Sequence, residues 1–416
     1  MSGVPQLRDA VWLEDRPVAR LLALLNSDGE EARVVGGAVR DHLLNLPVRE
    51  IDLATTALPQ EVMRRVAADG GRAIPTGIEH GTVTAVIDHR SFEITTLRQD
   101  VEAFGRKARV AFGRDWRADA ERRDFTMNAL SVAADGTVYD YVGGAADIRA
   151  RRVRFIGEPQ RRIEEDYLRI LRFFRFHAHF GLGGPDAVGL QACIRARAGL
   201  ETLSRERVRA EMLKLIVAPR ATPTLAVMAE SGLLGMVIGG VAYLASFENL
   251  VKLEAAIGVE PDPIRRLGAL GIWVAEDAER LTQRLRLSNA ESGRLAALDN
   301  WWRVTLEPDG QAAHALLYRL GPLSFVDRVL LAWSRSLAGA VDTTWRELAR
   351  LPQRWSVPAF PLKAADFTRR GLAAGPTLGA ALRAAEAAWV AANFPTDRAA
   401  IDALADSAAR QMMAQG

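Results

Sequence analysis

The strongest structural signals in this chain are Val-Gly-Gly-Ala-Val-Arg-Asp at residues 35–41 and Arg-Glu-Ile-Asp-Leu-Ala-Thr-Thr at residues 49–56. Gly36 and Gly37 lie where a predicted strand turns into a predicted helix, and glycine lets the backbone approach phosphate oxygens without a Cβ in the way. The start of that helix offers free N–H groups and the positive end of its dipole to an anion. Arg40 adds a planar fork of donors in the first turn. The pattern therefore predicts a phosphate site.

A pair of carboxylates follows this turn. Glu50 and Asp52 alternate on what the pattern predicts to be a strand, so both side chains should emerge on one face. Two carboxylates on one face repel each other unless a divalent cation lies between them. Alone, a Gly-Gly turn is common and a Glu-x-Asp pair is more often a solvated strand face. Their order along the chain indicates a site that holds a nucleoside triphosphate with Mg²⁺ and transfers its α-phosphate.

Composition bounds the class of protein. The chain has 416 residues, of which 49% are hydrophobic and 25% charged, so we expect roughly two to four globular domains. Cys193 is its single cysteine, which excludes an intrachain disulfide and indicates a reducing, cytoplasmic compartment. Residues 1–20 contain no apolar core, so we expect no signal peptide. Residues 231–247 form the longest uncharged run but are interrupted by glycines, so we expect no membrane segment.

Positive charge is concentrated in one segment. The whole chain has a net charge of +3, whereas residues 151–216 carry 13 arginines and one lysine against eight acidic residues, a local net charge of +6. This concentration indicates a polyanionic partner. The excess of arginine over lysine in the whole chain is equally consistent with a GC-rich genome.

The chain changes character near residue 150. The first 150 residues mix strand and helix patterns, which predicts strands at 34–35, 51–54, 82–87 and 92–97, helices at 41–46 and 58–68, a loop at 76–81 and a hairpin at 130–141. From residue 164 onward apolar residues recur at helical spacing, which predicts helices near 164–180, 186–197, 204–217 and 221–229 and further helices to the C-terminus. The expected fold is therefore α+β, with a mixed N-terminal part and an all-helical remainder.

Two further groups of residues in the mixed part are candidates for the site. Glu93, on the predicted strand 92–97, is either a third acidic group beside the carboxylate pair or the partner of an arginine. Arg122 and Arg123 offer donors for phosphate or ribose, and Asp124 offers an acceptor for a ribose hydroxyl. The alternative for this second group is a capped helix start with a local ion pair.

Glu165-Asp166-Tyr-Leu-Arg169 is the most specific motif in the helical part. On a helix, Asp166 and Arg169 share a face, and an acceptor beside a forked donor can read the Watson–Crick edge of a base. The aspartate would accept from the exocyclic amine of cytosine or adenine, and the arginine would donate to a ring nitrogen or a carbonyl oxygen. The alternative is a surface salt bridge.

With these residues in place, the chain resembles the class II tRNA nucleotidyltransferases, which are the CCA-adding enzymes, and the closely related bacterial poly(A) polymerases. The resemblance rests on five motifs in order, namely residues 36–41 with 50–52, 122–129, 140–144, 165–169, and 203–207 with Glu211. It is dense over residues 30–216 and weak over 217–300, where residues 284–289 are similar to a body-domain segment.

The resemblance implies a nucleotidyltransferase head of DNA polymerase β type followed by an all-α neck, body and tail. The implied domains are a catalytic head at 1–150, a neck with the nucleotide-selecting helix at 151–217, a body at 218–305, and a tRNA-binding tail at 306–416. The implied activity is addition of C, C and A to tRNA 3′ ends from CTP and ATP, with Mg²⁺ as cofactor. Poly(A) addition and a non-catalytic RNA-binding relative are the alternatives. Neither a membrane nor an obligate protein partner is expected.

The resemblance also assigns roles to residues. Catalysis falls to Glu50, Asp52 and Glu93, with Glu50 and Asp52 as the metal ligands. Nucleotide binding falls to Gly36, Gly37, Arg40, Arg122, Arg123, Asp124, Asn128, Glu165, Asp166, Arg169 and Arg172. Glu50 departs from the family, which has aspartate there, and we expect a working but slower enzyme. The segment 100–119 with Arg106 is expected to be a flexible loop of the kind that the family needs for the switch to ATP.

Overall fold

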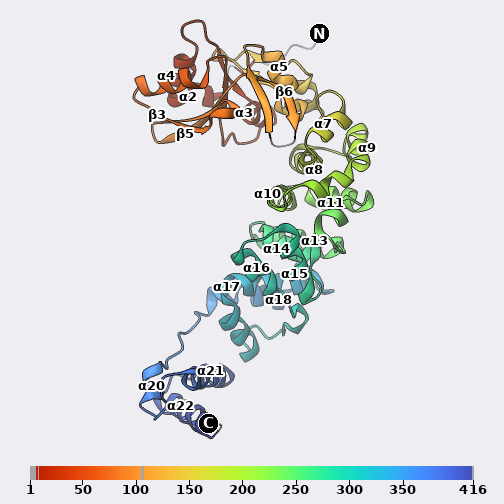
Figure 1. Ribbon diagram of the computed structural model, residues 1–416. Coiled ribbons are helices and arrows are strands. Elements are labelled where there is room, and N and C mark those ends of the chain that lie inside the picture. Colours follow the sequence, from red (N-terminus) through yellow and green to blue (C-terminus); the bar gives the residue numbers. More distant parts are fainter. Residues whose placement is uncertain (1–5, 8, 105–106, 415–416) are drawn as a thin grey trace. The chain divides into compact units, whose positions relative to one another are not determined.

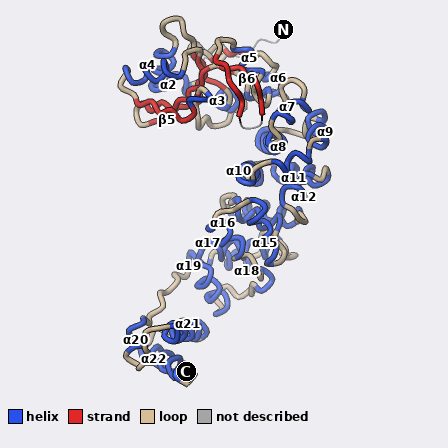
Figure 2. The backbone as a smooth tube through the Cα atoms, viewed as in Figure 1, coloured by secondary structure: helices blue, strands red, loops and turns tan. Residues whose placement is uncertain are grey.

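The structure is a computed structural model that describes residues 6–7, 9–104 and 107–414, with the side chains of 99–110 outside the description. The chain forms two compact units, Met1–Val237 and Ile238–Gly416 (Figure 1). Strands occur only in the first of them within the described residues, and the remainder is helical (Figure 2). This arrangement confirms the predicted α+β class. The predicted domain boundaries at 150, 217 and 305 stay predictions.

The first unit contains the elements on which the site is built. Its strands are β1 Ala32–Val35, β2 Asp52–Thr55, β3 Arg72–Gly77, β4 Thr82–Ile87, β5 Arg90–Thr96, β6 Arg98–Phe104, β7 Lys107–Phe112, β8 Ser131–Val132 and β9 Val138–Tyr139. Its helices are α1 Val11–Glu14, α2 Arg16–Leu25, α3 Gly37–Leu43, α4 Pro59–Ala68, α5 Trp116–Glu121, α6 Gly144–Arg149, α7 Pro159–Glu165, α8 Leu168–Phe180, α9 Ala187–Arg195, α10 Arg205–Ile216 and α11 Ala221–Glu230, with 3₁₀ turns η1 Ile78–His80, η2 Thr126–Asn128 and η3 Arg197–Thr202.

Seven strands form one mixed sheet in the order β3-β4-β5-β2-β1-β8-β9. Only β2 and β5 pair in parallel, and the other neighbours are antiparallel. The alternating sequence of β4 buries every second side chain, as expected for a strand with one covered face. Helices α2 and α4 contact strands of this sheet, and Leu53, Val83 and Ile94 are fully buried in its core. On the opposite face of these two strands Asp52 and Glu93 are exposed, whereas Ala54 is buried in a small apolar cluster with Val35, Leu97 and Trp116.

The sequence missed the edge strand β3. Residues 76–81 were expected to be a loop, but Arg72–Gly77 pairs with β4 through a register shift between Ile74 and Gly77. Pro75 and the low burial of this strand hid it, because proline in a sheet is tolerated only at edges or bulges. The segment 100–119, expected to be a flexible loop, is largely formed by β6, β7 and α5, and its flexibility stays a prediction. Arg106 lies outside the described residues.

The predicted helix 164–180 is two helices in the structure. Helices α7 and α8 are separated at Asp166, whose backbone is extended with φ −156° and ψ 106°. Its carboxylate accepts a hydrogen bond from the Leu168 backbone N–H at 3.1 Å, and its carbonyl accepts one from Arg169 at 3.0 Å. A short acidic side chain that bonds nearby backbone N–H groups competes with helix continuation. Asp166 and Arg169 therefore do not share a helix face.

The second unit is helical throughout its described part. After α12 Leu233–Ile238, which crosses the boundary, it contains α13 Leu244–Ile257, α14 Pro263–Gly271, α15 Ala275–Leu285, α16 Asn289–Ala296, the 3₁₀ turn η4 Trp301–Arg303, α17 Gln311–Ser334, α18 Thr343–Ala349, α19 Leu351–Arg354, α20 Ala364–Thr368, α21 Pro376–Ala391 and α22 Arg398–Met413. Helix α17 is kinked at Gly321, which has φ 72° and precedes Pro322. No helix in the described residues is long and apolar enough to cross a membrane.

Candidate active site

The glycine turn joins β1 to α3 in the way the sequence predicts. Gly36 is the residue before α3 and has φ 67°, a conformation that glycine adopts without strain. Its N–H donates to the Leu130 carbonyl at 3.0 Å, which fixes the turn against the β8 end of the sheet. A Cβ added at Gly36 would lie 3.4 Å from Arg123 Nη1. The turn therefore brings a helix start close to one of the predicted phosphate-binding arginines.

Sheet register brings two of the predicted carboxylates together. In the parallel pairing of β2 with β5, Leu53 is opposite Ile94, so Asp52 and Glu93 lie one step before them on neighbouring strands. Both are exposed, on the face opposite the buried Leu53 and Ile94. Glu50 is not on the strand, because β2 begins only at Asp52. Even so, the exposed, buried, exposed alternation of residues 50–52 persists.

Asp52 shows the electrostatic consequence of this grouping. Desolvation, followed by the charges of Glu93 and Glu50, raises the pKa of Asp52 to about 6, and the charge of Arg123 acts in the opposite direction. Asp52 retains an exposed surface, so its carboxylate is partly desolvated and still accessible to a ligand. Carboxylates that raise one another's pKa are relieved by a bound cation.

These oxygen ligands fit Mg²⁺. Within the described residues no three His, Cys, Asp or Glu side chains are close enough to form a complete metal cage. Mg²⁺ is commonly held by one or two carboxylates together with waters and substrate phosphates, so a complete protein cage is not required. Glu50 and Asp52 are the residues that would hold the ion, with Glu93 beside them.

Asp119 holds the two arginines of the second motif, and sequence reasoning missed it. Its buried carboxylate pairs with Arg122 Nη2 at 2.5 Å and with Arg123 Nη2 at 3.1 Å. Although burial raises the pKa of Asp119, the charges of Arg123 and Arg122 outweigh burial and keep that pKa below its ordinary value. The spacing from Asp119 to the arginines is three and four residues, the helical spacing of ion pairs, and this signal was available in the sequence.

The guanidinium of Arg40 is engaged by protein partners and is not directed freely at the glycine turn. It is buried, its Nε donates to Asp41 at 2.9 Å, and its Nη1 donates to Asn128 Oδ1 at 2.7 Å. Its guanidinium lies 4.0 Å from the ring centroid of Phe180 in α8. Burial lowers the pKa of Arg40, while the charge of Asp41 acts to raise it. Direct contact of Arg40 with phosphate stays a prediction.

Asp124 and Asn128 connect the second motif to α8. Asp124 Oδ2 accepts from Arg172 Nε at 2.7 Å, and Asp124 Oδ1 accepts from Asn128 Nδ2 at 3.2 Å. Burial raises the pKa of Asp124, but the charge and hydrogen bond of Arg172 outweigh it and lower that pKa. The acceptors of Asp124 are thus engaged within the protein.

The motif at residues 165–169, which the sequence predicts to read the base, is held by residues of neighbouring helices. Asp166 Oδ2 pairs with Arg207 Nη2 of α10 at 2.6 Å, and Arg169 Nη1 pairs with Glu165 Oε2 at 2.6 Å. Glu211 of α10 pairs with Arg175 of α8 at 2.5 Å, so α8 and α10 are joined at more than one point. The predicted acceptor and donor are therefore both held in place, although by different partners.

The fold and the site together define a nucleotidyltransferase: a glycine turn before a helix, carboxylates grouped on one face of a mixed sheet, and arginines beside them. A family model described as the poly A polymerase head domain matches residues 32–154. A second model, described as the probable RNA and SrmB-binding site of polymerase A, matches residues 189–243.

Curated relatives match along most of the chain. The mitochondrial CCA tRNA nucleotidyltransferase 1 of Mus musculus is 32% identical over 389 residues, which cover 91% of this chain and 87% of the relative. The CCA-adding enzyme of Limosilactobacillus fermentum is 33% identical over 381 residues, covering 89% and 91%. The chain therefore belongs to the family of CCA-adding tRNA nucleotidyltransferases, and its similarity to that family extends well beyond the motif-rich first half.

A solved structure agrees with this assignment. The crystal structure of the Bacillus stearothermophilus CCA-adding enzyme in complex with CTP matches with a TM-score of 0.75 and 28% identity, covering 96% of this chain and 99% of that one. The predicted family and fold are thus confirmed.

Proposed function

We propose that this protein adds C, C and A to the 3′ ends of tRNA from CTP and ATP without a nucleic-acid template. The observation that carries the proposal is the pairing of β2 with β5, which sets Asp52 beside Glu93 near the glycine turn. Family membership supports the same activity, since the relatives named above are CCA-adding enzymes and the solved one binds CTP.

The residues divide the work as follows. Glu50 and Asp52 would hold Mg²⁺, which when bound would supply charge stabilisation for the triphosphate and lower the pKa of the RNA 3′-hydroxyl. Gly36 and the start of α3 receive phosphate oxygens, and Arg123 lies beside them. Glu93 adds negative charge on the neighbouring strand. Catalysis rests on positioning and charge stabilisation.

Nucleotide choice is assigned to the break between α7 and α8. Asp166 accepts from the exocyclic amine shared by cytosine and adenine, and Arg169 donates to the ring nitrogen or carbonyl oxygen. Both side chains have protein partners, Arg207 and Glu165, so base reading requires these pairs to share or exchange their hydrogen bonds. Asp124 is joined to Arg172 of α8 near this region, and Asp124 and Arg122 act as positioning groups.

The longer-range assignments are parts of the same proposal. The head covers residues 1–150, the neck 151–217, the body 218–305 and the tail 306–416, with the tail and the basic neck along the tRNA. We assign the protein to a reducing compartment, the cytoplasm, because its only cysteine, Cys193, is a buried thiol.

A poly(A) polymerase is the second candidate, because the family model that matches residues 32–154 is described by that activity. One assay separates the two. Purified protein, Mg²⁺ and a tRNA transcript lacking CCA are incubated with CTP, with ATP or with both, and products are resolved at single-nucleotide resolution. Two additions with CTP and a third only when ATP is present establish CCA addition. A long ladder with ATP alone establishes poly(A) addition, and no extension supports a non-catalytic RNA-binding relative.

A further inference from the structure

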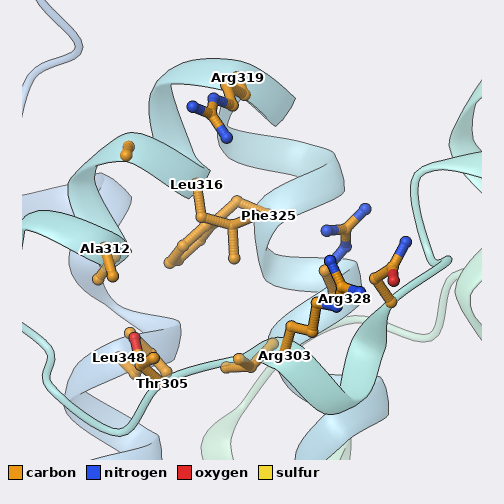
Figure 3. A pocket seen from close by; sticks show the side chains of 12 residues that line it. Arg303, Thr305, Ala312, Leu316, Arg319, Phe325, Arg328 and Leu348 are labelled. Carbon is orange, nitrogen blue, oxygen red and sulfur yellow. The ribbon is translucent and has the colours of Figure 1, made fainter. Parts of the chain in front are cut away.

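A cavity of about 340 Å³ lies in the second unit, beside the kink of α17. Three arginines from separate places in the chain line it: Arg303 from η4, Arg319 from α17 before the kink, and Arg328 from α17 after the kink. Figure 3 shows them with Phe325, which also lines the cavity. Three positive groups therefore face one small volume.

Among the residues that the structure describes, no acidic side chain lines this cavity. The remaining lining residues are uncharged, with Asn300 and Thr305 as the polar ones and Ala312, Leu316 and Leu348 among the apolar ones. The lining thus combines hydrogen-bond donors with an apolar wall. Such a mixture is typical of sites for small organic anions.

The two buried arginines in the described part of the second unit are neutralised by carboxylates, whereas the cavity arginines are exposed (Arg303, Arg319) or half-buried (Arg328). Arg265 pairs with Glu254 at 2.7 Å, and Arg266 pairs with the same carboxylate group at 2.7 Å. Within the described part of this unit, none of the three cavity arginines has a carboxylate within ion-pair distance. Their charge is available to a ligand in a way that the charge of Arg265 and Arg266 is not.

Arg328 is the most informative of the three. Its Nε donates to the Ala297 carbonyl at 2.6 Å, which fixes the orientation of the guanidinium plane. Burial lowers the pKa of Arg328, and the charge of Asp299 only partly opposes that effect. A desolvated guanidinium without a carboxylate partner is costly, and a bound anion relieves that cost.

We propose that this cavity binds the phosphate of a nucleotide, with the arginines around the anion and the base along Ala312 and Leu316. Guanidinium groups match phosphate geometry through paired donors, which lysine does not offer. The volume suits one small ligand. The nucleotide is either free in solution or part of an RNA strand. The site is formed entirely within the second unit, so it does not depend on the chemistry proposed for the head.

Photolabelling of the full-length protein tests this site. The two probes are 8-azidoadenosine 5′-monophosphate and a tRNA transcript that contains 8-azidoadenosine, each used with excess CTP to occupy the head. Labelled peptides are identified by mass spectrometry. We expect label within residues 300–348. Label from the free nucleotide assigns the site to mononucleotides, and label from the transcript alone assigns it to RNA.

Three variants test whether the labelling depends on this cavity. Arg319→Gln removes one charge, and Ala312→Phe keeps all three arginines but fills the cavity. Each should lower the labelling by about tenfold, the effect of one lost charge-assisted hydrogen bond or its equivalent. Arg383→Gln on α21, an exposed arginine outside the cavity, is the matched control and should label normally. Label confined to other residues, or equal label in all four proteins, would overturn the proposal whatever the head does.

Discussion

Asp124 Oδ2 accepts a charge-assisted hydrogen bond of 2.7 Å from Arg172 Nε, and Arg172 Nη2 forms an ion pair with the same oxygen at 2.5 Å. The first residue belongs to the arginine-rich motif that follows α5, and the second belongs to α8, immediately beyond the base-reading residues. This pair therefore couples the part of the protein that we propose holds the triphosphate to the part that we propose selects the base, because neither side chain can move without breaking a largely buried ion pair.

Asp124→Asn should destabilise the first unit. The change leaves the Arg172 guanidinium only the more distant Glu211 carboxylate, 3.7 Å away, and breaking a largely buried ion pair costs about 3 kcal/mol. Urea unfolding followed by circular dichroism measures this loss. Glu248→Gln, which removes the carboxylate of an exposed ion pair with Lys252 on α13, is the control and should change stability little. Equal effects of the two changes would contradict a structural role for the Asp124–Arg172 pair.

Asp52→Asn should reduce CTP incorporation by about a thousandfold, since a lost metal ligand removes several kcal/mol of charge stabilisation. Initial rates across a Mg²⁺ titration measure the effect. Glu50→Ala should also lower the rate, whereas Glu50→Asp should keep or increase it, because a shorter acid restores the family's usual ligand. If neither change at Glu50 alters turnover, Glu50 is not a metal ligand.

Arg207→Ala should relax nucleotide selection without abolishing catalysis. The Arg207 guanidinium holds the Asp166 carboxylate, and without it the proposed base acceptor loses its fixed position. We expect the ratio of kcat/KM for CTP to that for UTP to fall by about tenfold, the effect of one charge-assisted hydrogen bond. Arg207→Lys should recover part of the ratio. An equal loss of rate for both nucleotides would indicate a general structural role instead.

Stability should fall in mild acid because of His177. Burial and then the charge of Arg220 lower the pKa of His177 from 6.5 to about 4, so the folded protein holds this side chain neutral where the unfolded chain protonates it. The unfolded state then binds more protons between these values, and the free energy of unfolding decreases as the pH falls from 6.5 towards 4. Between pH 7.5 and 5 the histidine should account for about 2 kcal/mol.

Comparison with His177→Asn isolates this effect, because all other titrating groups are shared. The variant should be less sensitive to the change from pH 7.5 to pH 5 in urea unfolding. The Gly181 backbone lies against the His177 ring, so the smaller amide is the safer replacement. Parallel pH dependences of the two proteins would assign the acid sensitivity to other residues.

Binding of tRNA should depend strongly on salt. Residues 151–216 carry a net charge of +6, and neutralisation of RNA phosphates by arginine releases counterions. For several such contacts we expect the affinity for a tRNA transcript to fall by about a hundredfold between 50 and 200 mM salt. Fluorescence anisotropy at fixed pH measures it. An affinity that barely changes over this range would place the RNA elsewhere or make its contacts largely uncharged.

Regular local patterns made much of the fold predictable. Thr82–Ile87 alternates strictly and is a strand with the predicted bounds, and Pro59 begins a helix that ends where expected. The break at Asp166 was not predicted, because the apolar spacing of residues 164–180 continues across it. A side-chain cap decided the outcome there against the periodicity.

The candidate site was predictable as a set of residues and less so as a geometry. Sequence spacing indicated that Glu50 and Asp52 lie near each other, but only the register of β2 and β5 shows Glu93 beside Asp52. Likewise, the sequence indicated Arg122 and Arg123 as site residues, but the buried Asp119 that orients them was not among the predicted residues. Contacts made through tertiary packing cannot be read from spacing. The roles assigned to these residues stay predictions.

The parallel pairing of β2 with β5 also constrains how the protein is made. Parallel strands need a crossover, and here α4, β3 and β4 must all be synthesised before Glu93 can reach Asp52. Contacts this distant in sequence form late, since the chain between them must be ordered first. A nascent chain that ends before β5 therefore contains the glycine turn at Gly36 and Gly37, but it lacks Glu93 and so cannot bring the two carboxylates together. The head is expected to become competent for catalysis in one step during its synthesis, without a partly active precursor.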